Sequence, residues 1–323
     1  MRGINGTHMH VQLLIAALRR PRVMMRGLLP VATTLAMILS SPCAAGASLE
    51  EGYATVQETW ESLSGPDHDW RERGAQVDRA FDTGVLPHTA TLSRLSTPDL
   101  RVLLRATHAA AVAGKQPHYS AIALRVGVEL RKRGELQPAD ARAGATIAVL
   151  SRDAAALAPV SPWRAAFNGR PVPRWPRVTK PFEYWTPSAD GASFRAAHAD
   201  MASLKIIVIA HPACGFTRAV AEAARADPDV LRILSGSRAL WLSPQDGTLD
   251  LRIFTDWAER HPDLPIQVVA RQTDFADFGY WGTPTFYILR DGRVAARVVG
   301  WPRGGNKAAL QKAFADAGIA AEP

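Results

Sequence analysis

The chain has 323 residues, of which 47% are hydrophobic and 21% charged, a composition typical of globular protein with room for about two domains. Its formal net charge of +8 would suit a nucleic-acid ligand, but five arginines lie in residues 1–47, a segment without acidic residues. The rest of the chain has 33 basic and 30 acidic side chains, a net charge of only +3. This balance, with no long basic run, argues against nucleic-acid binding.

Residues 1–47 have the features of an export signal peptide. A basic region precedes an apolar stretch from Leu28 to Leu39, and the small residues Ala45–Ala47 form a cleavage site before Ser48. The apolar stretch is shorter than the ~20 residues that a membrane span needs, and no other run approaches that length. We therefore expect a periplasmic protein with no membrane span beyond the signal. The alternatives are an uncleaved anchor and lipid attachment at Cys43, which the preceding proline disfavours.

The cysteine count narrows the possible chemistry. The chain has two cysteines, Cys43 and Cys214, and cleavage of the signal would remove the first. A mature exported protein with a single cysteine has no internal disulfide, so an unpaired thiol in that compartment indicates a reactive role. A buried, inert thiol is the alternative, because free cysteines often lie in protein cores.

Residues 48–157 are predicted to form an α-helical domain. Apolar residues recur at helical spacing, as in the run from Leu49 to Trp60. The sequence Thr-Pro-Asp from Thr97 is typical of a helix start, with Thr97 as the N-cap. The expected helices run from residue 48 to a break at 64–67, and over 69–81, 97–114, 119–133 and 138–157.

Residues 158–181 are predicted to be a proline-rich, extended connector. Six prolines at this density disfavour a helix, and Trp163, Phe167 and Trp175 are interleaved with them. We expect the aromatic side chains to pack in a core or between domains; a peptide-binding platform is the alternative.

Residues 182–323 alternate between strand-like and helix-like segments. This alternation, followed by a terminal hairpin and helix, predicts an α/β domain. The expected strands cover 182–185, 205–210, 238–242, 266–269, 285–289 and 293–299, with a further segment at 275–280. The expected helices cover 194–201, the residues from 218 onward, 249–260 and 307–317.

The stretch from Leu204 to Arg218 contains the candidate reactive group. A buried strand ends before His211, and Cys214 follows at the start of a helix, where free N–H groups and the helix dipole lower a thiol pKa. Thr217, one helical turn later, can donate a hydrogen bond to the thiolate. His211 is a candidate proton partner, or else a solvated loop residue.

Two motifs together resemble the thioredoxin fold. Cys214-Gly-Phe-Thr217 lies at a strand-to-helix junction, and Gly282-Thr-Pro-Thr285 follows some seventy residues later before another strand. The resemblance implies a cis bond between Thr283 and Pro284, which would face the cysteine and form a groove for an extended substrate. Gly215 and Phe216, within the first motif, and Trp281, directly before the second, are further candidates for substrate contacts.

The resemblance also has consequences for domain order and for mechanism. It implies a thioredoxin-like domain over 182–323, preceded by the helical domain, and the inserted helix between Trp241 and Ile266 resembles exported TlpA-like relatives. Thioredoxins carry a second cysteine where this chain has Thr217, so an internal dithiol cycle is impossible. We therefore predict monothiol thiol–disulfide exchange through Cys214, with the resolving thiol supplied by a protein or by glutathione.

Three other readings of the cysteine motif remain open at this stage. Cys-Gly-Phe-Thr resembles the Cys-Gly-Phe-Ser of monothiol glutaredoxins, which bind a [2Fe–2S] cluster, but those enzymes are generally not exported and their glutathione-binding lysine has no match. It also resembles glutathione-peroxidase-like enzymes, with Gln245 and Trp281 as the matching partners and Gly282 in place of their asparagine. The third reading is a redox-inactive scaffold that binds proteins. We predict no bound cofactor or metal, since the histidines do not cluster with ligand spacing.

Overall fold

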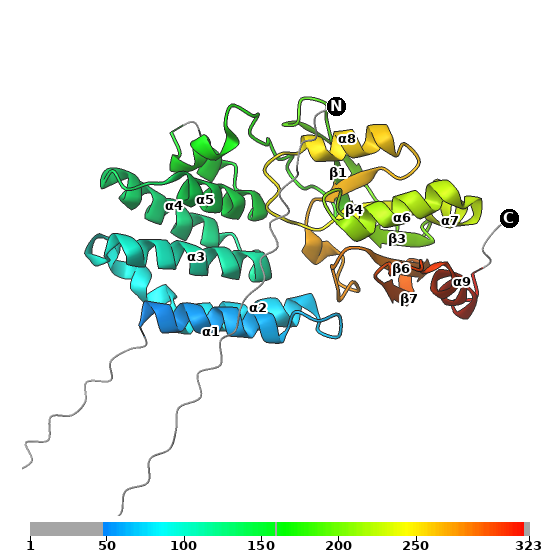
Figure 1. The fold of residues 1–323 in the computed structure, drawn as a ribbon, viewed down its shortest axis with the longest axis horizontal. Coiled ribbons are helices and arrows are strands. Elements are labelled where there is room, and N and C mark those ends of the chain that lie inside the picture. Colours follow the sequence, from blue (N-terminus) through cyan, green and yellow to red (C-terminus); the bar gives the residue numbers. More distant parts are fainter. Residues whose placement is uncertain (1–47, 159, 320–323) are drawn as a thin grey trace, which may run out of the picture. The chain divides into compact units, whose positions relative to one another are not determined.

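The fold is described from a computed structural model, in which residues 48–158 and 160–319 are the described part of the chain (Figure 1). The predicted signal peptide, with Cys43, lies outside these residues. Contacts group the described residues into one compact unit, so the division into separate domains stays a prediction. No helix within the described residues is long and apolar enough to cross a bilayer.

The first part of the described chain is helical, as predicted. Helix α3 packs against α1, α2, α4 and α5, so its buried residues form the centre of the helical core. The α-helices are α1 (Leu49–Ser62), α2 (Trp70–Gly84), α3 (Thr97–Gly114), α4 (His118–Lys132) and α5 (Pro138–Leu150). Shorter 3₁₀ segments are η1 (Leu86–Arg94), η2 (Ala155–Leu157) and η3 (Pro162–Phe167).

Two predicted helix boundaries are wrong for local reasons. The N-cap of α3 is Ser96 and not Thr97, because the Ser96 side chain accepts a hydrogen bond from the N–H of Asp99, whose carboxylate accepts one from Ser96 in return. Helix α5 ends at Leu150 and not at Leu157, since Arg152 adopts a left-handed φ of 53° that breaks the helical path.

The first half of the predicted connector is part of the helical core. Instead of an extended chain, it forms the 3₁₀ segment η3, which places Trp163 and Phe167 in the interior, as expected for the aromatic residues. Trp163 is fully buried, and its ring lies where a Cβ atom on Gly127 of α4 or Gly144 of α5 would overlap it. The absence of side chains at both glycines therefore makes the slot that holds the indole.

The rest of the chain builds a mixed seven-stranded sheet in the order β2-β1-β5-β4-β3-β6-β7. Strands β3, β4 and β5 run parallel, while β1 and β6 are antiparallel to their neighbours on either side. The strands are β1 (Glu183–Pro187), β2 (Phe194–His198), β3 (Ile206–Ile209), β4 (Ala239–Ser243), β5 (Ile266–Val269), β6 (Thr285–Arg290) and β7 (Arg293–Val299). The helices of this part are α6 (Gly215–Ala226), α7 (Pro228–Leu234), α8 (Arg252–Arg260) and α9 (Lys307–Asp316), with a 3₁₀ turn η4 (Gln272–Asp274).

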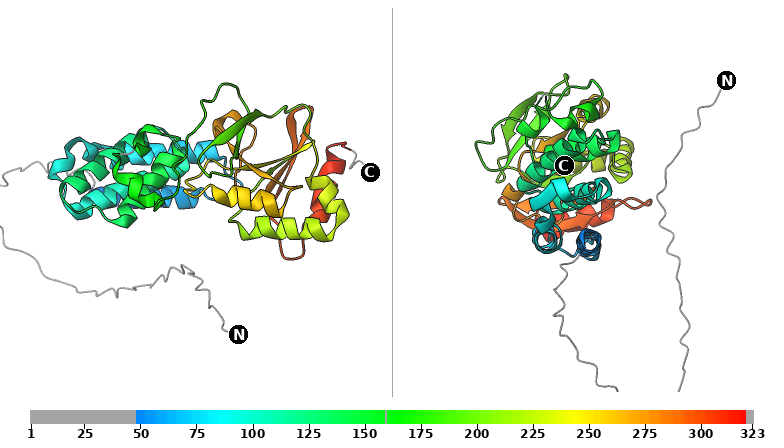
Figure 2. Two further views of the ribbon diagram at one scale, coloured as in Figure 1. Left: turned by 90° about the horizontal axis from the view of Figure 1, so that it is seen from above. Right: turned by 90° about the vertical axis from the view of Figure 1, so that its left-hand side faces the viewer.

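All four residues of strand β3 are buried. Because successive side chains point to opposite faces of a sheet, both faces of this strand are covered. Ile206 and Val208 contribute to the core formed with α6, α7, α8 and α9 (Figure 2). Ile207 and Ile209 contribute to a second core on the opposite face. That second core includes the aromatic residues Trp70, Phe275, Phe278, Trp281 and Tyr287.

The helical part and the sheet are joined by specific contacts. Trp70, the first residue of α2, is buried in the second core of the sheet, and its backbone N–H donates a hydrogen bond to the carbonyl of Gly279 at 2.9 Å. Arg170 forms an ion pair with Asp250 at 3.2 Å. The loop that precedes Thr283 is therefore held from outside the sheet by the start of a helix.

Three segments differ from the sequence prediction. Residues 194–201 were predicted to be a helix, but residues 194–198 form strand β2 and the rest is loop. A turn centred on Asp190 pairs β2 with β1, and this pairing outweighs helix propensity. Residues 275–280 form irregular chain in which Phe275 and Phe278 are buried, while Tyr280 is partly exposed. Helix α7 was not predicted; the sequence Asp227-Pro228 starts it, with Asp227 as its cap.

We predict that Gly144→Ala destabilises the protein by about 1–2 kcal/mol. The added methyl group would overlap the Trp163 ring, and such overpacking costs ~1–3 kcal/mol, partly offset by the ~0.5–1 kcal/mol that alanine gains over glycine in a helix. Urea unfolding followed by circular dichroism measures the change. Gly65→Ala is the matched control, because a Cβ there meets nothing within 4 Å. Equal stability of the two variants would contradict the tight fit of Trp163.

Candidate active site

Cys214 lies where β3 passes into α6. It is the N-cap of that helix, with extended backbone angles (φ −77°, ψ 125°), and its side chain is partly exposed. The N–H of Cys214 donates to the carbonyl of His211 at 2.9 Å, which closes a tight turn. The guanidinium of Arg218 donates to the carbonyls of Pro212 and Ala213 and so braces the same turn. The cysteine is thus presented by a hydrogen-bonded loop and not by a free strand end.

The Thr283–Pro284 segment contacts the sulfur from the other side. The peptide bond between these residues is cis, as the resemblance implied. The thiol of Cys214 donates to the carbonyl oxygen of Thr283 at 3.3 Å. Thr285, whose hydroxyl donates to Gly282 at 2.6 Å, secures the segment at the start of β6. The two motifs, which lie far apart in sequence, therefore meet at one sulfur atom.

Thr217 is a buried part of the cysteine site. Its side chain is fully buried, and its hydroxyl oxygen accepts a hydrogen bond from the N–H of His211 at 3.3 Å. A hydroxyl can accept one hydrogen bond and donate another, so Thr217 can hold the turn and still donate toward the sulfur. The N–H groups of Phe216 and Thr217, in the first turn of α6, lie on the same side.

These donors lower the pKa of the thiol. Burial raises the pKa of Cys214, but hydrogen bonds from the side chains of Thr283 and Thr217 and from the N–H groups of Thr217 and Phe216 outweigh it, and the pKa lies below its ordinary value. The bond from the thiol to the Thr283 carbonyl favours the protonated form, and it is lost when the thiol ionises. The more numerous donors therefore determine the direction of the shift.

His211 does not contact the sulfur through its ring in the way that a proton partner would. Its Nδ1 accepts from the N–H of Ala213 at 3.1 Å, so the neutral ring carries its proton on Nε2. Nε2 lies 3.2 Å from a carboxylate oxygen of Asp246 and 3.1 Å from the hydroxyl of Thr248. Burial raises the pKa of Asp246, but the His211 bond and the nearby hydrogen bonds outweigh it and lower the pKa overall. His211 thus anchors the loop instead of serving the thiol directly.

The partners expected for a peroxidase are not assembled at Cys214. The Gln245 side chain donates to the carbonyl of Leu150 at 2.7 Å and accepts from the N–H of Gln272, and none of its described hydrogen bonds goes to the cysteine. Trp281 is only 6% exposed and packs in the second core of the sheet, so a substrate could reach little of its side chain. Both residues matched a motif by order along the chain, which does not fix where their side chains lie.

A groove adjoins the cysteine on the α6 side. Its volume is about 700 Å³. Gly215 and Phe216, two of the predicted contact residues, line it, and Phe216 is 61% exposed although it is large and apolar. The remaining lining residues are Ala219, Glu222, Ala223, Ala226, Trp301, Pro302, Arg303, Gly304 and Gly305. The exposed ring of Phe216 therefore provides apolar surface two residues after the cysteine.

Sequence reasoning missed Arg218, Asp246 and Thr248. Asp246 and Thr248 follow the carboxyl end of β4, and the ends of neighbouring parallel strands meet at one sheet edge, so their closeness to the loop after β3 could have been inferred. No such signal exists for Arg218, whose loop contacts depend on the turn. Within the described residues, no group of three or more His, Cys, Asp and Glu side chains is arranged to hold a metal ion.

Comparison with known proteins adds little to this geometry. No protein-family model matches the chain, and no curated protein matches it. Among solved structures, the chain is similar to a thioredoxin-like protein from Bacteroides caccae, with 11% identity, over 88% of this chain and 98% of that chain, at a TM-score of 0.28. A TM-score of 0.28 is too low to assign a fold by similarity. The fold is therefore described from the strand order and register of the chain itself.

We predict that Thr217→Val raises the pKa of Cys214, because it removes a hydroxyl donor and keeps the side-chain shape. Only the thiolate reacts with iodoacetamide, so the alkylation rate at neutral pH should fall several-fold and the pH profile should move upward. Thr255→Val, which removes a hydroxyl on α8, is the control and should leave the profile in place. Superimposable profiles for the two variants would show that Thr217 does not stabilise the thiolate.

Proposed function

We propose that the chain is an exported, thioredoxin-like protein that performs monothiol thiol–disulfide exchange with Cys214 as the nucleophile. The observation that carries the proposal is the position of the sulfur, partly exposed at the N-terminus of α6 and in contact with the Thr283–Pro284 segment. A lowered thiol pKa and an accessible sulfur are the two requirements for attack on a disulfide. The strand order around β3 supports the thioredoxin-like assignment, and the signal-like residues 1–47 support a periplasmic location.

The proposed exchange reaction has two steps. The Cys214 thiolate attacks one sulfur of a substrate disulfide, a new S–S bond forms to Cys214, and the other substrate sulfur leaves as a thiolate. Since Thr217 cannot act as a second thiol, an external thiolate must then attack the mixed disulfide. That attack forms a new disulfide with the bound half and returns Cys214 as a thiolate. The external thiol belongs to a protein or to a small molecule such as glutathione.

The groove beside the cysteine favours a polypeptide as substrate. Phe216, two residues after the cysteine in the chain, lines an open groove, and an extended polypeptide could lie across its exposed ring. The Thr283 carbonyl, which accepts from the thiol in the free protein, becomes available to a substrate N–H when the thiol ionises. An apolar contact from Phe216 and a backbone contact from Thr283 are thus both available near the reacting atom.

We predict that the protein, from Ser48 onward, forms a stable adduct with glutathione disulfide. Mass spectrometry should detect one mixed disulfide per chain, which persists until free thiol is added, while Cys214→Ser forms none. Thr217→Cys supplies an internal resolving thiol one helical turn away. This variant should release the bound glutathione without added thiol and finish with an internal disulfide.

Two results would overturn the proposed function. If native protein forms no adduct but unfolded protein does, the cysteine is inaccessible and a redox-inactive scaffold explains the chain better. If the protein consumes hydrogen peroxide in a thiol-dependent, Cys214-dependent reaction faster than it exchanges disulfides, a thiol peroxidase explains it better.

We also predict that Phe216→Ser slows attack on a polypeptide disulfide but not on a small one. Loss of the apolar contact should reduce the rate with oxidised insulin about fivefold, equivalent to ~1 kcal/mol, and leave the rate with 2-hydroxyethyl disulfide nearly unchanged. Val160→Ser is the matched control, because Val160 is 79% exposed and does not line the groove. An equal loss with both disulfides would mean that Phe216 supports the loop and does not contact the substrate.

A further inference from the structure

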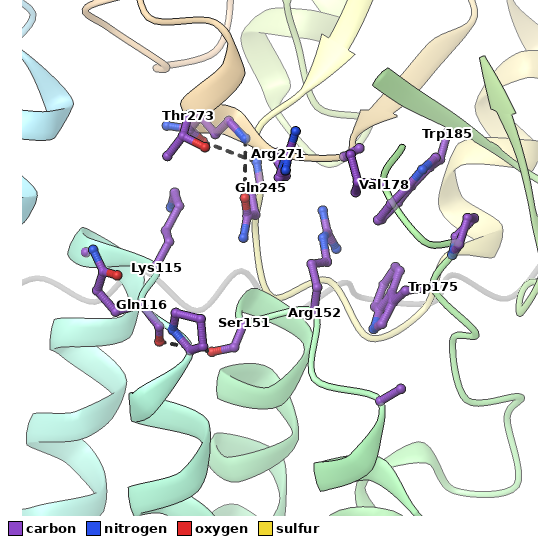
Figure 3. Close-up of a pocket in the computed structure, with 16 residues that line it drawn as sticks. Lys115, Gln116, Ser151, Arg152, Trp175, Val178, Trp185, Gln245, Arg271 and Thr273 are labelled. Carbon is purple, nitrogen blue, oxygen red and sulfur yellow. Dashed lines mark hydrogen bonds between the residues drawn. The ribbon is translucent and has the colours of Figure 1, made fainter. Parts of the chain in front are cut away.

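A second pocket lies between the ends of helices α3 and α5 and the loops that follow β4 and β5 (Figure 3). Its volume of about 450 Å³ is in the range of sites for small organic molecules. Cys214 is not among its lining residues, so the pocket is separate from the proposed reaction site. The side chains of Lys115 and Arg152 extend from the two helix ends into the same space as Gln245 (Figure 3).

The charged side chains that line this pocket are all basic. Lys115, Arg152 and Arg271 line it, and no aspartate or glutamate does. Arg271 forms an ion pair with Asp274 at 3.2 Å, so its charge is already matched. Among residues 48–158 and 160–319, Lys115 and Arg152 have no carboxylate within 4 Å. The pocket therefore holds two cations without a direct ion pair, and the charge of Asp246 acts on both only from beyond that distance.

Each of these cations has hydrogen-bond donors that the protein does not use. Lys115 donates from Nζ to the carbonyl of Val112 at 2.9 Å, and Arg152 donates from Nη2 to the carbonyl of Val269 at 3.2 Å. The Nε of Arg152 is buried and has no hydrogen-bond partner among the described residues. A buried donor without a partner is costly, which points to a missing acceptor.

Capping of helix C-termini explains only part of this arrangement. Lys115 follows α3 directly and Arg152 follows α5 by two residues, where the helix dipoles favour positive charge. Capping accounts for the Lys115 bond to Val112, but Arg152 donates to a β5 residue and leaves Nε unused. Burial lowers the pKa of Lys115 to about 8 and that of Arg152 to about 10, in each case opposed by the charge of Asp246. Two cations are therefore kept in a place that disfavours them.

The walls around the cations are apolar and aromatic. The Arg152 guanidinium lies over the Trp175 ring at 4.5 Å and over the Trp185 ring at 5.4 Å, and the two indoles are stacked on each other. Pro176 also lines the pocket, and Val178 lies on the same side as the two indoles (Figure 3). A guanidinium that packs over an aromatic ring keeps its planar array of donors, and such an array suits a carboxylate.

We propose that this pocket binds a small organic carboxylate, with its anionic group on Lys115 and Arg152 and its apolar body against the Trp175 side of the pocket. The site requires both parts of the ligand, since an inorganic anion would leave the apolar wall unfilled. The proposal is independent of exchange chemistry at Cys214, because no lining residue belongs to the cysteine site.

Isothermal titration calorimetry with three probes tests the proposal on the chain from Ser48 onward. The probes are 2-naphthoate, its neutral analogue 2-naphthamide, and inorganic phosphate. We expect 2-naphthoate to bind at least tenfold more tightly than either of the others. Lys115→Gln and Arg152→Gln should each weaken 2-naphthoate binding about tenfold or more, which is the loss of ~1.4 kcal/mol. Arg79→Gln, which removes an exposed cation of α2 outside the pocket, should leave the affinity unchanged.

Equal affinity for 2-naphthoate and 2-naphthamide, or unchanged affinity in Lys115→Gln, would overturn the proposal, as would the absence of 2-naphthoate binding to folded protein. Phosphate binding as tight as that of 2-naphthoate would overturn the role of the apolar wall. Lys115→Gln keeps the test valid even if Arg152→Gln proves unstable.

The pH dependence provides a second readout. Lys115 loses its charge as the pH rises through about 8, while 2-naphthoate stays ionised. Asp246, Arg73 and Arg152 are the charged groups that act on Lys115, and none of them changes the direction of this loss. The affinity for 2-naphthoate should therefore fall above pH 8 in the unsubstituted protein. This fall should be absent in Lys115→Gln. A fall of equal size in both proteins would contradict a role for Lys115.

Discussion

Burial of β3 on both faces is the constraint on which the rest of the structure depends. A strand of four aliphatic residues has no polar face, so it must lie inside the sheet, away from both edges, with helices on one side and the aromatic core on the other. That position brings its carboxyl end between β4 and β6. The cysteine loop after β3 thereby meets Thr283 before β6 and Asp246 after β4, and these neighbours hold the turn and the sulfur.

The cysteine site stabilises a thiolate with hydrogen-bond donors and not with a fixed positive charge. Arg218 is close in sequence, but its guanidinium is bound to carbonyls of the loop. Thr217, by contrast, is buried and can serve the loop and the sulfur at once. Hydrogen bonds act over a short range, so the reactivity of Cys214 depends on the geometry of one turn and only weakly on the charge of the rest of the surface.

Features of the fold and the site could be predicted from the sequence where neighbouring residues determine them, and not where distant segments do. The run Ile206–Ile209, the helix start after Cys214 and the Asp291-Gly292 hairpin turn, with φ of 53° and 76°, are set by adjacent residues and were recognisable. Strand β2 was not, because its alanines favour a helix until β1 pairs with them. Gln245 was assigned by its order along the chain, while its actual neighbours, such as Leu150, come from another part of the chain. The pocket that joins Lys115 to Arg152 has no sequence pattern, since it exists only when the ends of two helices meet the sheet.

The contact of Trp70 with the sheet determines whether the sheet region can be produced as a separate fragment. Its indole fills part of the aromatic face that carries Trp281, and its backbone holds Gly279, a few residues before Thr283. A truncated chain that begins at the sheet would expose this apolar face to water and release the loop beside the cysteine. Such a fragment would be poorly soluble and a poor guide to the reactivity of the whole protein. The helices are thus needed for the integrity of the sheet region, whatever else they bind.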